Sequence, residues 1–180
     1  MTPKRMLAIA LVLLAFLAVD ARADSRQELD RDGKKALQTL ISKVPAAKML
    51  NGKAVAVLVF PDMVKAGFMF GGQIGEGVLL RGGKSSGYYN SVGASYGLQA
   101  GAQKFGYALF FMNEKSLQYL NSSEGFEVGM GPSFVVVDEG KGKSMTTTTA
   151  TQDVYAFIFS QQGLMGGLGL QGTKITKLEK

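Results

Sequence analysis

The stretch from Gly87 to Met112 constrains the fold of this chain more than any other. It is rich in both aromatic residues and glycines, contains no proline, and has Lys104 as its only charged residue. Small and large side chains interleave along it, which is typical of long β-strands that curve or that let another backbone come close. The sequence therefore predicts a strongly curved sheet built around this stretch.

Apolar runs separated by turn residues predict further strands on both sides. They cover residues 54–60, 67–81, 126–137, 144–151, 154–160 and 168–178, and the central stretch itself divides into two strands near Lys104. Short connections favour antiparallel pairing of neighbouring strands. The predicted fold class is α+β, with a strongly curved, mostly antiparallel, glycine-rich sheet or half-barrel of about seven to eight strands.

A helix is predicted from Ser25 to Val44, ending before Pro45. Its apolar residues share one face: Leu29, Gly33, Ala36, Leu37, Leu40, Ile41 and Val44. Two interpretations stay open at this point. The helix lies on the sheet with its polar side in water, or its apolar face meets a membrane surface with lysines along its flank. The spacing alone favours the first.

Two shorter helical segments are predicted within the β-rich part. Pro61 to Ala66 forms about one turn, with Pro61 at its start and Gly67 as its C-cap. Asn113 is typical of an N-cap and predicts a short helix through Leu120. The predicted domain thus has a helix over residues 25–44 and a β-rich core over residues 54–178.

Glutamines follow glycines repeatedly along the predicted strands. The positions are Gln73, Gln99, Gln103 and Gln171. We interpret them as marks of places where strands cross closely, because a glutamine amide can pair there with exposed backbone groups.

The N-terminus has the three parts of an export signal. Lys4 and Arg5 precede an apolar run from Met6 to Val19, and Ala21-Arg22-Ala23 is a small-x-small cleavage sequence. The alternative is a membrane anchor, but the apolar run is shorter than the roughly 20 residues that span a bilayer. We expect residues 1–23 to be a signal peptide cleaved after Ala23, and the mature domain, residues 24–180, to lie in the periplasm or cell envelope.

The composition excludes several kinds of chemistry. Cysteine and histidine are both absent, which removes thiolate sites, the commonest general base and the commonest metal ligand. The carboxylates are few, and no rule of sequence spacing identifies an acid–base pair among them. We therefore predict no catalytic residues, no metal site and no cofactor. The formal net charge of +6, which becomes +4 without Lys4, Arg5, Asp20 and Arg22, favours anionic surfaces but does not predict nucleic-acid binding.

The densest basic region lies between the predicted helix and the first strands. Its lysines are Lys34, Lys35, Lys43, Lys48, Lys53 and Lys65. If the helix packs against the strand that starts at Ala54, these lysines share one end of the molecule and attract lipid phosphates. The simpler interpretation is a solvated charged face.

Five long segments carry a family resemblance. They are VFPDMVKAGFMFGGQIGEGVLL, SYGLQAGAQKFGYALFFM, VGMGPSFVVVD, TTTTATQDVYAFIFSQQGL and GLGLQGTKIT. In one order from about Val55 to Leu178, they resemble the SYLF-domain family, the lipid-binding domain also called the yeast-type actin-binding domain.

The resemblance implies binding to phosphoinositides and other anionic lipids, with an N-terminal amphipathic helix contributing. In eukaryotic members it also implies actin binding beside SH3 or FYVE modules. This chain has an export signal and neither module, so it resembles the stand-alone bacterial members, which would not meet actin. We expect a non-enzymatic module that associates peripherally with anionic phospholipid, and the six lysines are its candidate lipid-binding residues.

Two alternatives differ in kind from a lipid-binding module. The glycine-rich strands could build a structural scaffold that binds itself or an envelope protein. A small outer-membrane barrel is the alternative architecture, but the run from Val55 to Phe60 is apolar on both faces, which a barrel strand with a polar interior is not.

Overall fold

The computed structural model describes residues 25–122, 126–127, 131–137, 151–163 and 173–179. Its elements are α2 (Arg26–Lys43), α3 (Pro45–Asn51), β1 (Ala56–Arg81), β2 (Lys84–Phe111), α4 (Glu114–Leu120), β3 (Phe126–Glu127), β4 (Phe134–Val137), β5 (Val154–Gly163) and β6 (Thr173–Leu178). The predicted strand over 144–151 lies almost wholly outside the described residues.

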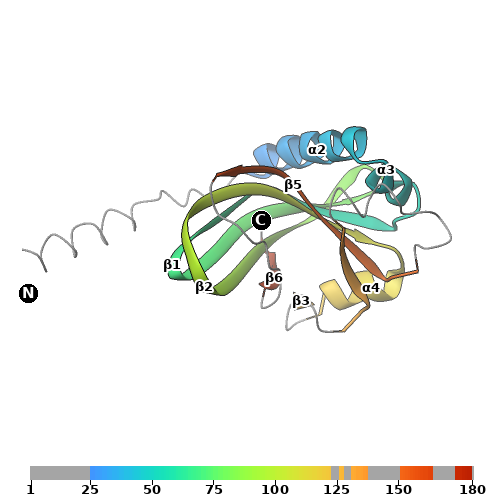
Figure 1. Cartoon of the computed structure of the whole chain (residues 1–180). Helices are drawn as coiled ribbons and strands as arrows, with labels where there is room; N and C mark the ends of the chain where they lie inside the picture. Colours follow the sequence, from blue (N-terminus) through green and yellow to red (C-terminus); the bar gives the residue numbers. More distant parts are fainter. Residues whose placement is uncertain (1–24, 123–125, 128–130, 138–150, 164–172, 180) are drawn as a thin grey trace, which may run out of the picture.

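A long antiparallel hairpin of β1 and β2 is the frame of the molecule. The two strands pair from Ala56↔Phe111 to Arg81↔Lys84 around the turn at Gly82 and Gly83. Strand β6 adds to the first part of β2 and β5 to its last part, while β4 pairs with β5 in parallel and β3 with β6. The sheet curls strongly (Figure 1), and the predicted α+β class with a half-barrel sheet is confirmed.

Two breaks predicted inside the long strands are wrong. Residues 61–66 are not a helical turn, because β1 runs through them and only shifts register between Phe60 and Met63. A proline is tolerated at such a bulge, where it removes no ladder hydrogen bond. Strand β2 likewise continues through Lys104. Two pairs of predicted strands thus merge, and the described residues form a six-stranded sheet.

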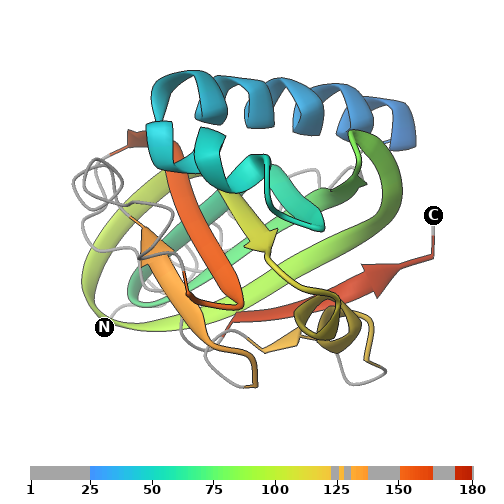
Figure 2. The same ribbon diagram turned by 90° about the vertical axis from the view of Figure 1, so that its right-hand side faces the viewer.

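Both faces of the sheet are covered, which explains the doubly apolar run that begins β1. On one face, called the outer face, Val57 and Val59 pack with residues of α2 and α3. On the other, the inner face, Leu58 and Phe60 pack in a cluster that includes Leu117 of α4. Figure 2 shows α2 across one side of the curled sheet and α4 beyond the other. Side chains alternate between the two faces along a strand. Because both faces are covered here, consecutive residues at the start of β1 must all be apolar.

Helix α2 lies on the outer face, as the first interpretation of its apolar stripe predicted. Its start is fixed by a capping box between Ser25 and Glu28. Gly33 sits against the sheet so closely that an added Cβ would lie 2.3 Å from a methyl carbon of Val78. Pro45 does end α2, but it also begins α3, which the sequence analysis missed; proline is favoured at the first position of a helix.

Glycines in β1 allow the curled strand to approach itself. A Cβ at Gly77 would lie 2.6 Å from the Val59 carbonyl oxygen, and one at Gly75 would lie 2.9 Å from the Asp62 carbonyl oxygen. The two arms of β1 therefore face each other across the interior at backbone distance. This is the close approach that the glycine pattern predicted.

The glutamine interpretation holds in part. Gln73 is buried, and its amide Nε2 donates to the Thr173 hydroxyl of β6 at 2.8 Å beside Gly93. The partner is therefore a side chain rather than backbone. Gln103 is also buried, on β2 opposite Lys65. The side chains of Gln99 and Gln171 lie outside the described residues.

A carboxylate ties α4 to the sheet. The Asp153 carboxylate accepts hydrogen bonds from the Ser133 backbone N–H at 2.9 Å, from the Ser133 hydroxyl at 2.8 Å and from the Asn113 side-chain Nδ2 at 2.6 Å. Asn113 in turn caps α4, as predicted, by accepting from the Ser116 amide. The hydrogen bonds from Ser133 and then Asn113 lower the pKa of the Asp153 carboxyl.

Asp153→Asn is expected to lower the free energy of unfolding at pH 7 by about 1–2 kcal/mol, because charge-assisted hydrogen bonds are lost. A carboxyl whose pKa is lowered by folding stabilises above its unfolded pKa of about 3.9, and loses that contribution as the pH falls through its folded value. The difference between variant and wild type should therefore shrink in acid. Urea unfolding against pH measures it, with the exposed Asp62→Asn as control; a gap that widens in acid would contradict the assignment.

Candidate functional site

Five of the six candidate lysines are exposed around the two N-terminal helices. Lys34, Lys35 and Lys43 lie on α2, Lys48 on α3, and Lys53 in the turn that follows. From Gly33 to Pro61 the sequence contains no acidic residue. This stretch therefore forms a basic surface, here called the lysine surface and defined by those five lysines.

The acidic residues at the start of α2 are engaged elsewhere. Glu28 belongs to the capping box, Asp30 accepts a hydrogen bond from the Tyr88 hydroxyl at 3.1 Å, and Asp32 pairs with Arg31 at 2.8 Å. The hydrogen bond from Arg31 lowers the pKa of the Asp32 carboxyl. Among the described residues, the five lysines form no ion pair. Their charge is therefore available to an external anion.

The lysines of α2 surround its solvent side. Lys34 and Lys43 are nine residues apart, so they project about 180° apart around the helix axis, with Lys35 between them. All three can reach one plane that touches the solvent side of α2, because lysine side chains are long and flexible. The geometry suits a broad anionic surface.

Lys65 does not belong to the lysine surface. It is 1% exposed, and this burial lowers the pKa of its ammonium group. Beyond the bulge at Pro61 and Asp62, Met63 and Lys65 point to the inner face. A helical turn over residues 61–66 cannot give this alternation. Predicting a helix there instead of a strand therefore led to the wrong prediction that Lys65 is exposed.

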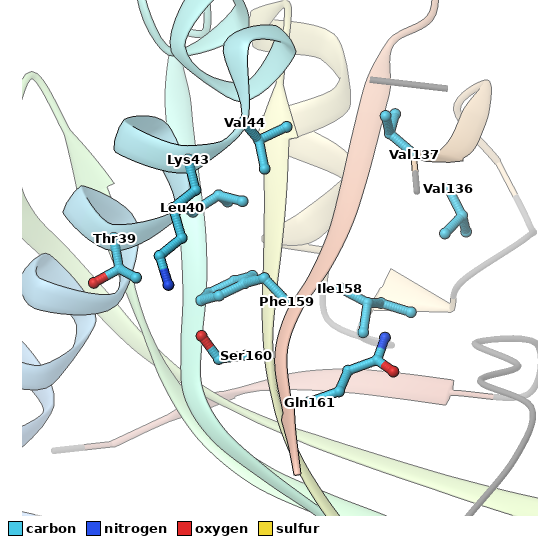
Figure 3. Close-up of a pocket in the computed structure, with 10 residues that line it drawn as sticks. All are labelled: Thr39, Leu40, Lys43, Val44, Val136, Val137, Ile158, Phe159, Ser160 and Gln161. Carbon is cyan, nitrogen blue, oxygen red and sulfur yellow. The ribbon is translucent and has the colours of Figure 1, made fainter. Parts of the chain in front are cut away.

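Helix α2 has a groove along each flank. The larger, about 680 Å³, lies between α2 and the ends of β4 and β5. Its described lining is Thr39, Leu40, Lys43, Val44, Val136, Val137, Ile158, Phe159, Ser160 and Gln161, as Figure 3 shows. The other, about 400 Å³, includes Lys34, Gln38 and the Gly82–Gly83 turn. Sequence reasoning found the lysines beside these grooves but not the grooves.

Ser160 is an unusual residue in the wall of the larger groove. It has a φ of 53° and, within the described ranges, is the only residue other than glycine with a positive φ. Such a conformation costs about 1–2 kcal/mol for an L-residue. It lies where the β2–β5 pairing skips one residue, between Lys104↔Gln162 and Gly106↔Phe159. This one-residue bulge and its strain were not visible in the sequence.

Other kinds of site find no support in the part of the chain that the structure covers. No three acidic, histidine or cysteine side chains gather there as metal ligands. Of the helices described, none combines the length and the apolar character needed to cross a membrane.

The comparisons with known proteins bear on the second half of the chain. Residues 92–180 match the model of the family described as Ysc84: Las17-binding protein actin regulator. No curated protein matches the chain. The match begins within β2, and β1, which precedes it, pairs with β2 along almost its whole length. The resemblance seen in the sequence is thereby confirmed: the chain belongs to the SYLF-domain (Ysc84) family, a family of lipid- or actin-binding domains.

Proposed function

We propose that this protein is a non-enzymatic module that binds anionic phospholipid surfaces peripherally through the lysine surface. The observation that carries the proposal is the set of five exposed lysines on α2, α3 and the following turn, in a stretch without acidic residues. Each basic residue held near an anionic membrane contributes about 1 kcal/mol. Five such residues are enough for reversible attachment without insertion.

The docked position of α2 decides which side of the helix meets the lipid. Leu29 and Leu40 are buried against the sheet, so the apolar stripe is occupied within the protein itself. The contact is then electrostatic and made by the solvent side of α2. This differs from an amphipathic helix that inserts its apolar face, and it predicts a strong dependence on salt.

The site of action that we propose is the cell envelope. The basic start, apolar run and Ala21-Arg22-Ala23 sequence support export with cleavage after Ala23, and every described helix and strand lies after this point. Mass spectrometry of the protein isolated from its native cells should find a chain that begins at Asp24. A chain that retains Met1 would contradict cleavage.

Co-sedimentation with vesicles tests the lipid proposal. Purified residues 24–180 should pellet with vesicles that contain phosphatidylglycerol, should stay in the supernatant with phosphatidylcholine alone, and should be released as ionic strength rises from about 0.05 to 0.5 M, since screening shortens the reach of surface charge. Binding that is equal on neutral vesicles, or that survives high salt, would contradict an electrostatic surface.

A second candidate, a scaffold that binds itself or an envelope protein, is favoured by one observation. Ile74 and Val92 are 55% and 47% exposed, and they are the large exposed hydrophobic residues of the described surface. They are also direct partners on β1 and β2, so they form one small apolar patch. Light scattering separates the self-associating form of this candidate from the first, because a stable monomer at high concentration argues against it.

A further inference from the structure

We propose that the larger groove beside α2 binds a single anionic lipid molecule, with its phosphate at Lys43 and one acyl chain against Val136 and Ile158. This inference rests on the proposed function and deepens it: the lysine surface attracts the membrane, and the groove takes up one molecule from it. Here the groove is defined by its described lining residues, given above.

One end of the groove supplies hydrogen-bond donors for a phosphate. Figure 3 shows the Lys43 ammonium extending from α2 toward Phe159 and Ser160. In the described part of the chain, neither the Lys43 ammonium nor the Ser160 hydroxyl has a hydrogen-bond partner, whereas the Thr39 hydroxyl already donates to the Lys35 carbonyl at 3.0 Å. The cation and the serine hydroxyl are therefore the free donors at this end, and a phosphate oxygen accepts from both kinds of group.

The side of the groove away from Lys43 carries aliphatic side chains beside the side-chain amide of Gln161. Val136 of β4 and Ile158 of β5 line the side away from Ser160 (Figure 3) and are only partly buried. Both pack on the inner-face cluster, whereas Val137 and Phe159 pack on the outer face. The groove therefore crosses the edge of β5 beyond its last described pair with β4, Val137↔Phe157. Partly exposed aliphatic side chains at one end of the groove and a lone cation at the other match an amphiphile, which has a charged end and an apolar end. A volume of about 680 Å³ lies within the range of about 300–1,000 Å³ that is usual for small-molecule sites.

The bulge in β5 explains how the polar end is built. The Phe159 ring packs on Gly106, where an added Cβ would lie 2.4 Å from it, so the ring is held in place. The extra residue in β5 then puts Ser160 into a positive φ at the groove wall. Bulges and strained residues of this kind are concentrated at functional sites, where they redirect a side chain.

The phosphate belongs at the Lys43 end for an electrostatic reason. A neighbouring cleft of about 290 Å³ shares Thr39, Phe159 and Ser160 with the groove, and its lining includes Lys35 together with Asp32 and Asp62. The lining of this cleft has one lysine and two carboxylates, of which Asp32 pairs with Arg31, so the cleft favours an anion less than the groove does. The described lining of the groove contains Lys43 and no carboxylate.

A tryptophan introduced into the groove tests the proposal by its fluorescence. The chain has no tryptophan, so Gln161→Trp places a single indole in the groove wall, at an exposed position outside the core. Titration of this variant with oleoyl lysophosphatidate, kept below its micelle concentration, should shift the emission to shorter wavelength and saturate. Oleoyl lysophosphatidylcholine of the same chain length and inorganic phosphate are the two controls, and each should be at least about tenfold weaker.

Lysine variants in the same background locate the phosphate. Lys43→Gln should weaken lysophosphatidate binding about tenfold, the usual effect of losing one charge-assisted hydrogen bond. Lys177→Gln removes an exposed lysine of β6 outside both the groove and the lysine surface and should leave this binding unchanged. Equal loss in both variants would overturn the groove in favour of a general charge effect. Equal binding of the two lipids would overturn the placement of the phosphate.

Failure of this inference and failure of the proposed function give different results. If anionic vesicles sediment the protein but lysophosphatidate monomers neither shift the emission nor saturate, the groove proposal is wrong and the lysine surface stands. If the monomer binds and vesicles do not sediment the protein, the lysine surface is wrong and the groove acts alone on free lipid.

Discussion

Replacing Lys34, Lys35, Lys43 and Lys48 together by glutamate is expected to abolish sedimentation with anionic vesicles. If each lysine near the membrane contributes about 1 kcal/mol, losing four removes about 4 kcal/mol, or roughly a thousandfold in affinity. The introduced carboxylates add repulsion to this loss. The four side chains are exposed, so each substitution should change the free energy of unfolding by no more than about 0.5 kcal/mol and the protein should stay folded. Co-sedimentation and thermal unfolding, measured on the same samples, check both statements.

A matched control separates position from net charge. Lys84, Lys104, Lys174 and Lys177 are exposed lysines on β2 and β6, and changing them to glutamate alters the net charge by the same amount. We expect this variant to keep most of its vesicle binding. If both variants lose vesicle binding equally, the net charge of the protein explains the binding and the position of the lysines does not matter. If the first variant still binds while folded, the lysine surface is not the lipid contact.

Gly77→Val is expected to be the most damaging single substitution in β1. Its Cβ would lie 2.6 Å from both the Val59 carbonyl oxygen and a ring carbon of Phe60, distances that real side chains do not adopt. The Phe60 ring is fully buried, and the carbonyl belongs to the other arm of the same strand, so neither can move aside easily. Overpacking of this kind costs about 1–3 kcal/mol or more, a large share of a total stability of about 5–15 kcal/mol.

Gly72→Val is the matched control for this effect. Gly72 is an exposed residue of β1, and the nearest atom to an added Cβ is the Gly93 carbonyl oxygen at 3.6 Å. A β-branched residue is favoured in a strand where it has room, so the control should unfold near the wild-type urea midpoint. A wild-type midpoint for Gly77→Val would show that the two arms of β1 are not in contact.

The sequence predicted those parts of the fold that depend on residues close together in the chain. The glycines of the hairpin predicted close approach because only a residue without a side chain permits it. The Asn113 cap and the apolar face of residues 25–44 were predicted because capping and helical period involve neighbours in sequence. The resemblance, resting on long segments, predicted the family.

The rest depends on contacts that are distant in sequence. Pro61 has the same local pattern at a strand bulge as at a helix start, so β1 was divided and Lys65 was placed on the surface. The larger groove joins Lys43 to Ser160, which are more than a hundred residues apart. Ser160 stands out only by its positive φ, and the residue types around it do not predict that backbone conformation.

The coverage of both sheet faces makes the first helix difficult to release. Lifting α2 would bring Val78 and Leu80 into water together with its own Leu40. A lid that opens over a polar site exposes polar groups, whereas lifting α2 would expose the apolar cluster on the outer face of the sheet. A chain that lost α2 would present an apolar sheet face and would be prone to stick to other chains. Proteolytic trimming at the start of the mature protein is therefore harmless only as far as Ser25, and every turn removed beyond it weakens the whole molecule.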